Sequence, residues 1–361
     1  MRVLALTPNL YGRSPGQRSS IELWEKVLGP AGISLDHHPF ETEPLREVIY
    51  RPGNYRRKAI ETVRAYRQQL GALRTLDDYD AVLIYREAAL IGPELIERLA
   101  ARHRKPVIYQ LDDPLYVRYR SPFSGYLSYL KFFGKVGRIC RLSRVVIVNS
   151  SFHREYARRF NADVREIPSV VDADRYFPAP SEGGNGRICV GWTGSESTAG
   201  NLSVIAGPIG ELARRPEVEL RFIGVEESPL PGVETVVQPW RPESEVDDLR
   251  RLDVGLLPLP VNEWNKRKFF LKLVQYMALG IPAVCTPLGA NPEVVEHGRT
   301  GFLADSDREW ATTLERLVDD PALRAEVGAR AAAVARERYT LQANAERIVE
   351  AFRVATDKTR A

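Results

Sequence analysis

Cysteine, histidine and methionine are scarce in this chain of 361 residues, which holds three, five and two of them respectively. The cysteines are odd in number, far apart and set in apolar surroundings, which indicates buried reduced thiols and argues against a disulfide framework. The histidines do not combine with the cysteines at any metal-ligand spacing. We therefore expect no protein-bound metal.

The sequence also lacks an apolar run long enough to span a membrane. Only five apolar residues precede Pro8, which is too few for the core of a signal peptide. This first stretch predicts a β-strand, and we expect a cytoplasmic protein.

Charge is uneven along the chain, although the net charge is only +4. Residues 1–180 hold 29 Lys and Arg against 20 Asp and Glu, whereas residues 181–361 hold 22 against 27. A basic first half and an acidic second half predict different partners for the two halves.

Short apolar runs alternate with helical patterns, which predicts an α/β protein with parallel sheets covered on both faces. A stretch rich in Pro and Gly at 172–186 interrupts the alternation and predicts a linker. We therefore expect a Rossmann-like domain over 1–171, a second one over 187–338 and a final helix over 339–361. Two such domains place a cleft between two sets of strand carboxyl ends, where ligands bind in open α/β sheets.

The stretch from Trp264 to Leu303 is the most informative. Lys268, Lys272 and Gln275 have the spacing of one helical face, and Gly280 is a helix terminator. A short buried strand and a Gly-containing loop follow. Two lysines near a helix start are candidates for an anion site, and a solvated face of an ordinary helix is the alternative.

The chain resembles the GT-B glycosyltransferases, specifically the retaining family 4 group. The motifs that carry the resemblance are QYMALGIPAVCTPLGANPEVVEHGRTGFL at 275–303, VGWTGS at 190–195 and VVDADRYFP at 170–178. The resemblance implies two facing Rossmann-like domains and a C-terminal helix that crosses back to the first. It also implies transfer of a sugar from a UDP- or GDP-sugar, with retention, to a polysaccharide, lipid-linked or natural-product acceptor, without a required metal.

Members of this family often carry two glutamates eight residues apart, where this chain has Arg267 and Gln275. Gln275 can still hydrogen-bond a ribose hydroxyl, but Arg267 cannot accept a hydrogen bond from a sugar. Either another group holds the sugar or this branch uses the helix differently. A catalytically silent nucleotide-sugar-binding protein and a GT-B epimerase are the alternative functions.

The resemblance implies a donor site in the second domain and an acceptor site in the first. Departure of a nucleoside diphosphate places charge on its β-phosphate, so fixed cations and backbone N–H groups are expected to stabilise it. Lys268 and Lys272 are the candidate cations, with Lys268 as a catalytic residue. The other donor-side candidates are Trp192, Gly194, Ser195, Gln275, Gly289 and Glu293. Glu293 has the alternative of a first-turn acid favoured by the helix dipole.

The acceptor side has its own candidates in the first domain. Asp112 and Asp113 follow a predicted strand and are expected to orient an acceptor hydroxyl or take its proton. Helix capping before Pro114 is the alternative interpretation. Gly12 and Arg18, in and after the loop PNLYGRSPG, are expected to complete this side.

The segment from Tyr116 to Arg144 contains seven basic residues and no acidic one. Its bases are Arg118, Arg120, Lys131, Lys135, Arg138, Arg141 and Arg144, interleaved with Tyr and Phe. This pattern suits an anionic membrane surface or a phosphate-bearing acceptor. An amphipathic helix with its aromatic residues in the core is the alternative, and no nucleic-acid-binding module is present.

Overall fold

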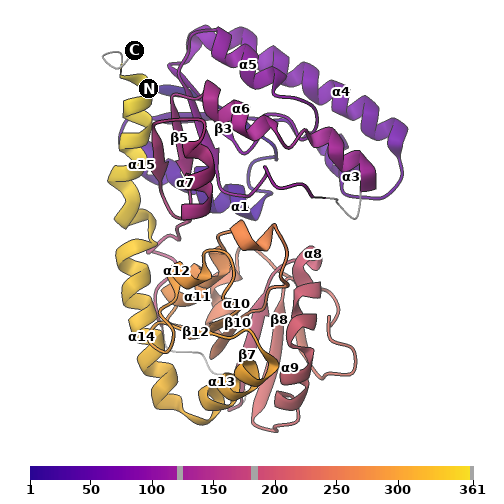
Figure 1. The fold of residues 1–361 in the computed structure, drawn as a ribbon, viewed down its shortest axis with the longest axis vertical. Coiled ribbons are helices and arrows are strands. Elements are labelled where there is room, and N and C mark those ends of the chain that lie inside the picture. The colour runs from indigo at the N-terminus through magenta and orange to yellow at the C-terminus, as the bar shows by residue number, and fades with distance from the viewer. Residues whose placement is uncertain (120–124, 180–185, 358–361) are drawn as a thin grey trace. The chain divides into compact units, whose positions relative to one another are not determined.

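The computed structural model describes residues 1–119, 125–179 and 186–357. It divides into two compact units (Figure 1), one formed by Met1–Ser169 with Asn344–Ala361 and the other by Val170–Ala343. Each unit is an α/β structure built on one six-stranded parallel sheet. No helix among the described residues is long and apolar enough to cross a membrane.

The sheet of the first unit has the strand order β2-β1-β3-β4-β5-β6. Its strands are β1 Arg2–Thr7, β2 Ser34–Pro39, β3 Ala81–Tyr85, β4 Val107–Leu111, β5 Val145–Val148 and β6 Val164–Glu166. The three central strands β3, β4 and β5 are fully buried, as expected when helices cover both faces of a parallel sheet. The strand order reverses between β1 and β3, so the loops that follow these strands border a topological switch point.

The helices of the first unit connect these strands along the chain. They are α1 Pro15–Gln17, η1 Arg18–Glu22, α2 Leu23–Leu28, α3 Glu43–Ile49, α4 Tyr55–Ala72, η2 Leu73–Asp78, α5 Leu95–Arg102, η3 Gly125–Lys131, α6 Lys135–Leu142 and α7 Ser151–Arg158. The last helix, α15 Leu341–Thr356, joins this unit from Asn344 onward. Its buried Phe352 packs edge-on against Trp24. The chain end therefore returns to the first unit, as the GT-B resemblance implies.

The sheet of the second unit has the order β12-β11-β10-β7-β8-β9. Its strands are β7 Ile188–Thr193, β8 Val218–Ile223, β9 Val236–Gln238, β10 Val254–Leu257, β11 Ala283–Cys285 and β12 Phe302–Leu303. Its helices are α8 Glu196–Ala199, η4 Gly200–Ile205, α9 Ala206–Leu212, α10 Glu245–Arg250, η5 Asn265–Arg267, α11 Leu271–Ala278, α12 Asn291–Val294, α13 Asp307–Asp319 and α14 Pro321–Arg338. The switch point of this sheet lies between β7 and β10.

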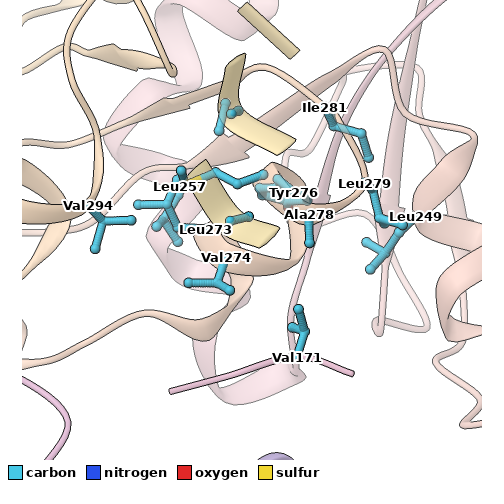
Figure 2. Close-up of a cluster of buried hydrophobic side chains, with 14 of the residues drawn as sticks. Val171, Leu249, Leu257, Leu273, Val274, Tyr276, Ala278, Leu279, Ile281 and Val294 are labelled. Atoms are coloured by element: carbon cyan, nitrogen blue, oxygen red, sulfur yellow. The ribbon is translucent and has the colours of Figure 1, made fainter. Parts of the chain in front are cut away.

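Helix α11 is the central helix of the second unit. Figure 2 shows its side chains Leu273, Val274 and Tyr276 within a buried apolar cluster that also includes Leu257 of β10 and Val171. The helix ends at Ala278, Gly280 lies just past its end with a positive φ of 73° that suits glycine, and Pro282 follows. A Cβ at Gly328 of α14 would overlap the Gly280 carbonyl, so α14 packs directly on this helix end. Local stop signals and close packing together fix the length of α11.

The three cysteines are free and buried, as expected from their apolar surroundings. Burial raises the pKa of the Cys140 thiol to about 12 and that of Cys189 to about 12. A thiol that stays protonated is a poor nucleophile, so these side chains belong to the core.

Candidate functional site

Tyr276 anchors α11 at the carboxyl edge of the second sheet. Its Oη accepts a hydrogen bond from the Thr193 N–H at 3.1 Å and donates one to the Leu256 carbonyl at 3.4 Å. A Cβ at Gly255 would overlap the Tyr276 ring, so glycine in β10 makes room for it. Because Lys272 lies one helical turn before Tyr276, these contacts hold Lys272 beside the end of β7.

Lys272 lies over an indole ring at the switch point between β7 and β10. Its ammonium is 4.4 Å from the centroid of the Trp192 ring, which is a cation–π distance. A Cβ at Gly194 would overlap both this ring and the ammonium, so only glycine fits there. Trp192 is 1% exposed, and its ring therefore supports the lysine as part of the core. A direct contact of Trp192 with the donor stays a prediction.

No carboxylate among the described residues pairs with Lys272. The groups that act on its ammonium are the Trp192 ring and the positive charge of Lys268. Burial, helped by the positive charge of Lys268, lowers the pKa of Lys272 to about 7. A desolvated ammonium without a counter-ion gains stability when an anion binds next to it. This edge of the sheet is therefore suited to a phosphate group.

Lys268 lies before α11, and the expectation that both lysines share one helical face is wrong. The short helix η5 ends at Arg267, Lys268 is extended (φ −97°, ψ 143°), and α11 begins at Leu271. The Lys268 carbonyl accepts a hydrogen bond from the Ala290 N–H at 3.1 Å. The extended backbone of Lys268 interrupts the helix, so the helical spacing does not continue from Lys268 to Lys272.

Gly289 brings the loop after β11 against the segment that carries Lys268. Its φ is +60°, and a Cβ would overlap the carbonyl oxygens of Lys268 and Asn265. The close approach of these two backbones needs glycine at this position. The structure therefore places Gly289 next to Lys268, as a residue that positions the backbone.

The backbone N–H groups expected to bind phosphate at Gly194 and Ser195 are already paired in the structure. The Gly194 N–H donates to the Ile223 carbonyl at 2.9 Å, and the Ser195 N–H donates to Thr198 Oγ1 at 3.2 Å. Ser195 caps the four-residue helix α8. A phosphate contact of these two N–H groups therefore stays a prediction, and what the structure shows of Gly194 is the space that it leaves beside Lys272.

Gln275 lies in a polar cluster inside the second unit. Its Nε2 donates to Tyr176 Oη at 2.9 Å and to Glu245 Oε1 at 3.4 Å, and Trp240 Nε1 donates to the same Glu245 oxygen at 3.1 Å. The N–H groups of Gln275 are thus engaged. The predicted contact with a ribose hydroxyl stays a prediction, and the side-chain amide oxygen is the atom that would make it. The segment from Asp172 to Tyr176, predicted as the start of a linker, packs into this unit.

Glu293 and Arg267 are nearer the surface. Glu293 is exposed in the first turn of α12, and its donor contact stays a prediction. Arg267 pairs with Glu263 at 2.6 Å. At the position where the family often has a glutamate, the chain therefore has an arginine that is bound to a neighbouring acid.

The aspartate pair of the first unit lies at the carboxyl end of β4. Asp112 and Asp113 are 8% and 7% exposed. Residues 115–119, the described stretch directly after Pro114, form a turn and contain no helix, so the capping interpretation is wrong. Burial raises the pKa of Asp112, and the positive charge of Arg86 opposes this shift.

Arg86 is the partner that sequence reasoning missed. Its Nε is 2.5 Å from Asp112 Oδ1, and its Nη2 is 2.7 Å from Asp113 Oδ2. Tyr85 Oη donates to Asp112 Oδ2 at 2.7 Å. Both carboxylate oxygens of Asp112 accept hydrogen bonds from Arg86 or Tyr85. Asp112 therefore stabilises the cluster of Tyr85, Arg86, Asp112 and Asp113, in addition to being a candidate base.

The backbone of Arg86 adopts a left-handed conformation with φ of 60°. Its N–H donates to the Gln110 carbonyl at 2.9 Å, and its own carbonyl accepts from Tyr109 Oη at 2.8 Å. A non-glycine residue at positive φ is uncommon and persists where the surroundings hold it. Here two residues of β4 hold it and aim the guanidinium at the aspartates.

Gly12 and Arg18 lie in and directly after the loop that follows β1. The Gly12 N–H donates to the buried Glu22 carboxylate at 3.0 Å, which fixes the loop after β1. Gly16 is the glycine that approaches the cluster, because a Cβ there would overlap the Arg86 guanidinium. Arg18 is half-buried at the start of η1, and its acceptor role stays a prediction.

The basic segment from Tyr116 to Arg144 divides into buried and surface parts. Lys135 is buried and pairs with Glu87 at 2.8 Å, and Arg144 donates to the Asp357 carbonyl at 2.9 Å. These two bases therefore stabilise the first unit. Tyr116 stacks on Tyr156, whereas Tyr129 and Phe132 are exposed. Arg120 and Phe123 lie outside the described residues.

Comparison with known proteins identifies the second unit. Residues 187–320 match the family model of glycosyl transferases group 1. A relative, the D-inositol 3-phosphate glycosyltransferase of Pseudarthrobacter chlorophenolicus, is 31% identical over 152 residues, which are 42% of this chain and 34% of the relative. The chain thus matches only about a third of the length of this curated relative.

Two solved structures share the fold over nearly all of both chains. The sucrose-phosphate synthase of Thermosynechococcus elongatus has a TM-score of 0.73 at 16% identity and covers 98% of each chain. The Anabaena HepE structure in complex with UDP and glucose has a TM-score of 0.68 at 16% identity, with 98% and 99% coverage. At these identities the likeness shows the fold, which is GT-B.

Proposed function

We propose that this chain, a GT-B protein whose residues 187–320 form a group 1 glycosyltransferase domain, transfers a hexosyl-type sugar from a nucleotide diphosphate donor. The observation that carries the proposal is Lys272, a partly desolvated cation without a carboxylate partner in the described chain, at the switch point of the second sheet. A UDP- or GDP-sugar supplies the diphosphate that such a cation favours. The structural neighbour in complex with UDP and glucose favours a UDP-sugar over a GDP-sugar as the donor.

In the proposed reaction, the bond between the anomeric carbon and the β-phosphate oxygen breaks, and the diphosphate leaves with its electron pair. Lys272 and Lys268 stabilise the negative charge that grows on the phosphate. An acceptor hydroxyl forms the new bond to the anomeric carbon and gives its proton to the oxygen of the departing diphosphate, with retention at the anomeric carbon. The acceptor is a sugar hydroxyl of a polysaccharide, a lipid-linked sugar or a natural product, and Asp113 is the candidate that orients it.

A donor screen tests this proposal directly. Purified protein is incubated with UDP- and GDP-sugars and an acceptor panel, and release of the nucleoside diphosphate is measured. We expect release with at least one donor and unchanged turnover after EDTA treatment, because fixed lysines supply the positive charge that a metal would otherwise provide. Failure to bind or turn over every nucleotide sugar would refute the proposed function, and a loss on EDTA treatment would refute its metal independence.

Lys268→Ala is expected to lower kcat about 10²-fold, by analogy with the loss of one charge-stabilising group in a transition state. Thermal stability should change little, because Lys268 is half-buried on an extended segment. Lys266→Ala is the matched control, since Lys266 is an exposed lysine two residues away that pairs with Glu263. Equal turnover of the two variants would remove Lys268 from the mechanism.

We also propose that the protein works at the inner face of a membrane as a peripheral enzyme. The exposed aromatic residues of the 116–144 segment support this position, and a lipid-linked acceptor would be presented there.

A further inference from the structure

An open groove runs between α5 and α6 in the first unit. Its volume is about 450 Å³. Its lining consists of Arg98, Ala101, Arg102, Arg138, Arg141 and Leu142. Four arginines and two apolar residues thus line the groove, and two of the four arginines lie on α5, outside the basic segment that the sequence pattern highlights.

The positive charge of this groove is only partly neutralised. Glu94, whose side chain is 2% exposed, pairs with Arg98 at 2.6 Å and with Arg138 at 2.7 Å. Burial opposes the ionisation of Glu94, but these two arginines lower its pKa to about 2, so it stays charged. Arg102 and Arg141 have no carboxylate partner within the described ranges, and Arg141 lies 4.7 Å above the Phe160 ring. One carboxylate against four arginines leaves a net charge of +3.

Large apolar side chains are exposed near the starts of α5 and α6, the two helices that carry the arginines of the groove. Leu95, Tyr129, Leu130 and Phe132 are 44–54% exposed. The Gly92 N–H donates to the Leu130 carbonyl at 2.6 Å, so η3 lies against the segment that leads into α5. The Lys135 N–H donates to the Phe132 carbonyl at 2.7 Å, where α6 begins. The apolar side chains therefore lie where the two arginine-bearing helices start.

We propose that this face docks on an anionic lipid bilayer, with lipid phosphates held by the arginines of the groove. Guanidinium groups bind phosphate oxygens in pairs, and their apolar stems tolerate the headgroup region. The aromatic and leucine side chains at the starts of the same two helices would enter the boundary between headgroups and acyl chains. An acidic protein or a soluble phosphate would use the arginines alone, without the exposed apolar side chains. The inference specifies the docking surface of the proposed peripheral enzyme and does not depend on sugar transfer.

Vesicle binding of the full chain tests the docking surface. Vesicles of phosphatidylcholine with and without phosphatidylglycerol are mixed with protein at low salt, and the bound fraction gives the affinity. The variant Arg102→Gln/Arg141→Gln leaves the buried Glu94 with both of its partners. It should bind anionic vesicles about 30-fold more weakly, from the contribution of each base near a charged surface. Wild-type binding should also fall in 0.5 M salt, because charges are then screened over a few ångströms.

The control variant is Arg336→Gln/Arg353→Gln, which changes the net charge equally at two exposed arginines outside the groove. It should bind like the wild type. Equal binding of wild type to neutral and anionic vesicles, or equal losses in both double variants, would overturn the proposal. If inorganic phosphate displaces the protein from anionic vesicles, the groove binds a soluble ligand instead, and this result would also overturn the proposal. Nucleotide release measured on the same samples separates this result from the proposed transfer activity.

Discussion

Arg86→Ala is expected to destabilise the first unit by about 3–5 kcal/mol, the usual cost of breaking a buried ion pair by removing one partner. The Arg86 guanidinium forms ion pairs with both Asp112 and Asp113, and all three side chains are largely buried. Without it, two carboxylates face each other in a site that already raises the pKa of Asp112 through burial. Urea unfolding, followed by far-UV circular dichroism, measures the change.

Two further variants distinguish the ion pair from ordinary surface electrostatics. Arg57→Ala removes an exposed partner of Glu47 in the same unit, and it should cost less than about 1 kcal/mol. Arg86→Ala/Asp112→Asn removes one of the two uncompensated charges and should recover part of the lost stability. If Arg86→Ala unfolds at the same urea concentration as Arg57→Ala, the buried cluster does not stabilise the unit.

The aspartate pair could be found from the sequence, but its partner could not. Asp112 and Asp113 stand out because two acids follow an apolar strand, whereas Arg86 is one of many arginines in a basic half. Their contact depends on β3 and β4 being neighbours in register, with Tyr85 opposite Gln110. A rule that compares the residues after each pair of adjacent strands would have identified Arg86, once the strand order was known.

On the donor side, local sequence pattern predicts the elements but not the contacts between them. The strands, the position of α11 and the glycine that ends it follow from local pattern, and the structure has them there. The helical spacing of Lys268 and Lys272 is misleading, because Lys268 is extended and its carbonyl bonds to Ala290, a residue on another loop. The role of Gly194 was also hidden, since it depends on Trp192 and Lys272 occupying the space beside it. Periodicity describes one segment, and these contacts join several.

Lys272→Met is expected to lower kcat by about 10²- to 10³-fold while raising the melting temperature. The loss follows from removing a fixed positive charge from the leaving phosphate. The gain follows from the pKa of Lys272, which is about 7 in the folded chain and ordinarily 10.5. Folding therefore favours the neutral amine, and below pH 10.5 this preference costs stability, increasingly so as the pH falls toward 7. Methionine removes that cost and keeps the apolar contact with Trp192.

Donor binding should then depend on pH through Lys272. Only the protonated amine attracts a diphosphate, so UDP affinity should fall as the pH rises through 7. Binding should also raise the pKa of the bound lysine, so the complex should take up protons near pH 7.5. Calorimetry in two buffers with different ionisation enthalpies measures this uptake.

Lys272→Arg is the decisive comparison, because an arginine stays protonated throughout this range. It should abolish proton uptake and flatten the pH dependence of UDP binding, whatever its effect on turnover. If the wild type binds UDP without proton uptake at pH 7.5, Lys272 is already fully charged in the free protein. The cation–π contact with Trp192 would then stabilise the ammonium enough to offset its burial, and the lysine would bind phosphate as a permanent charge.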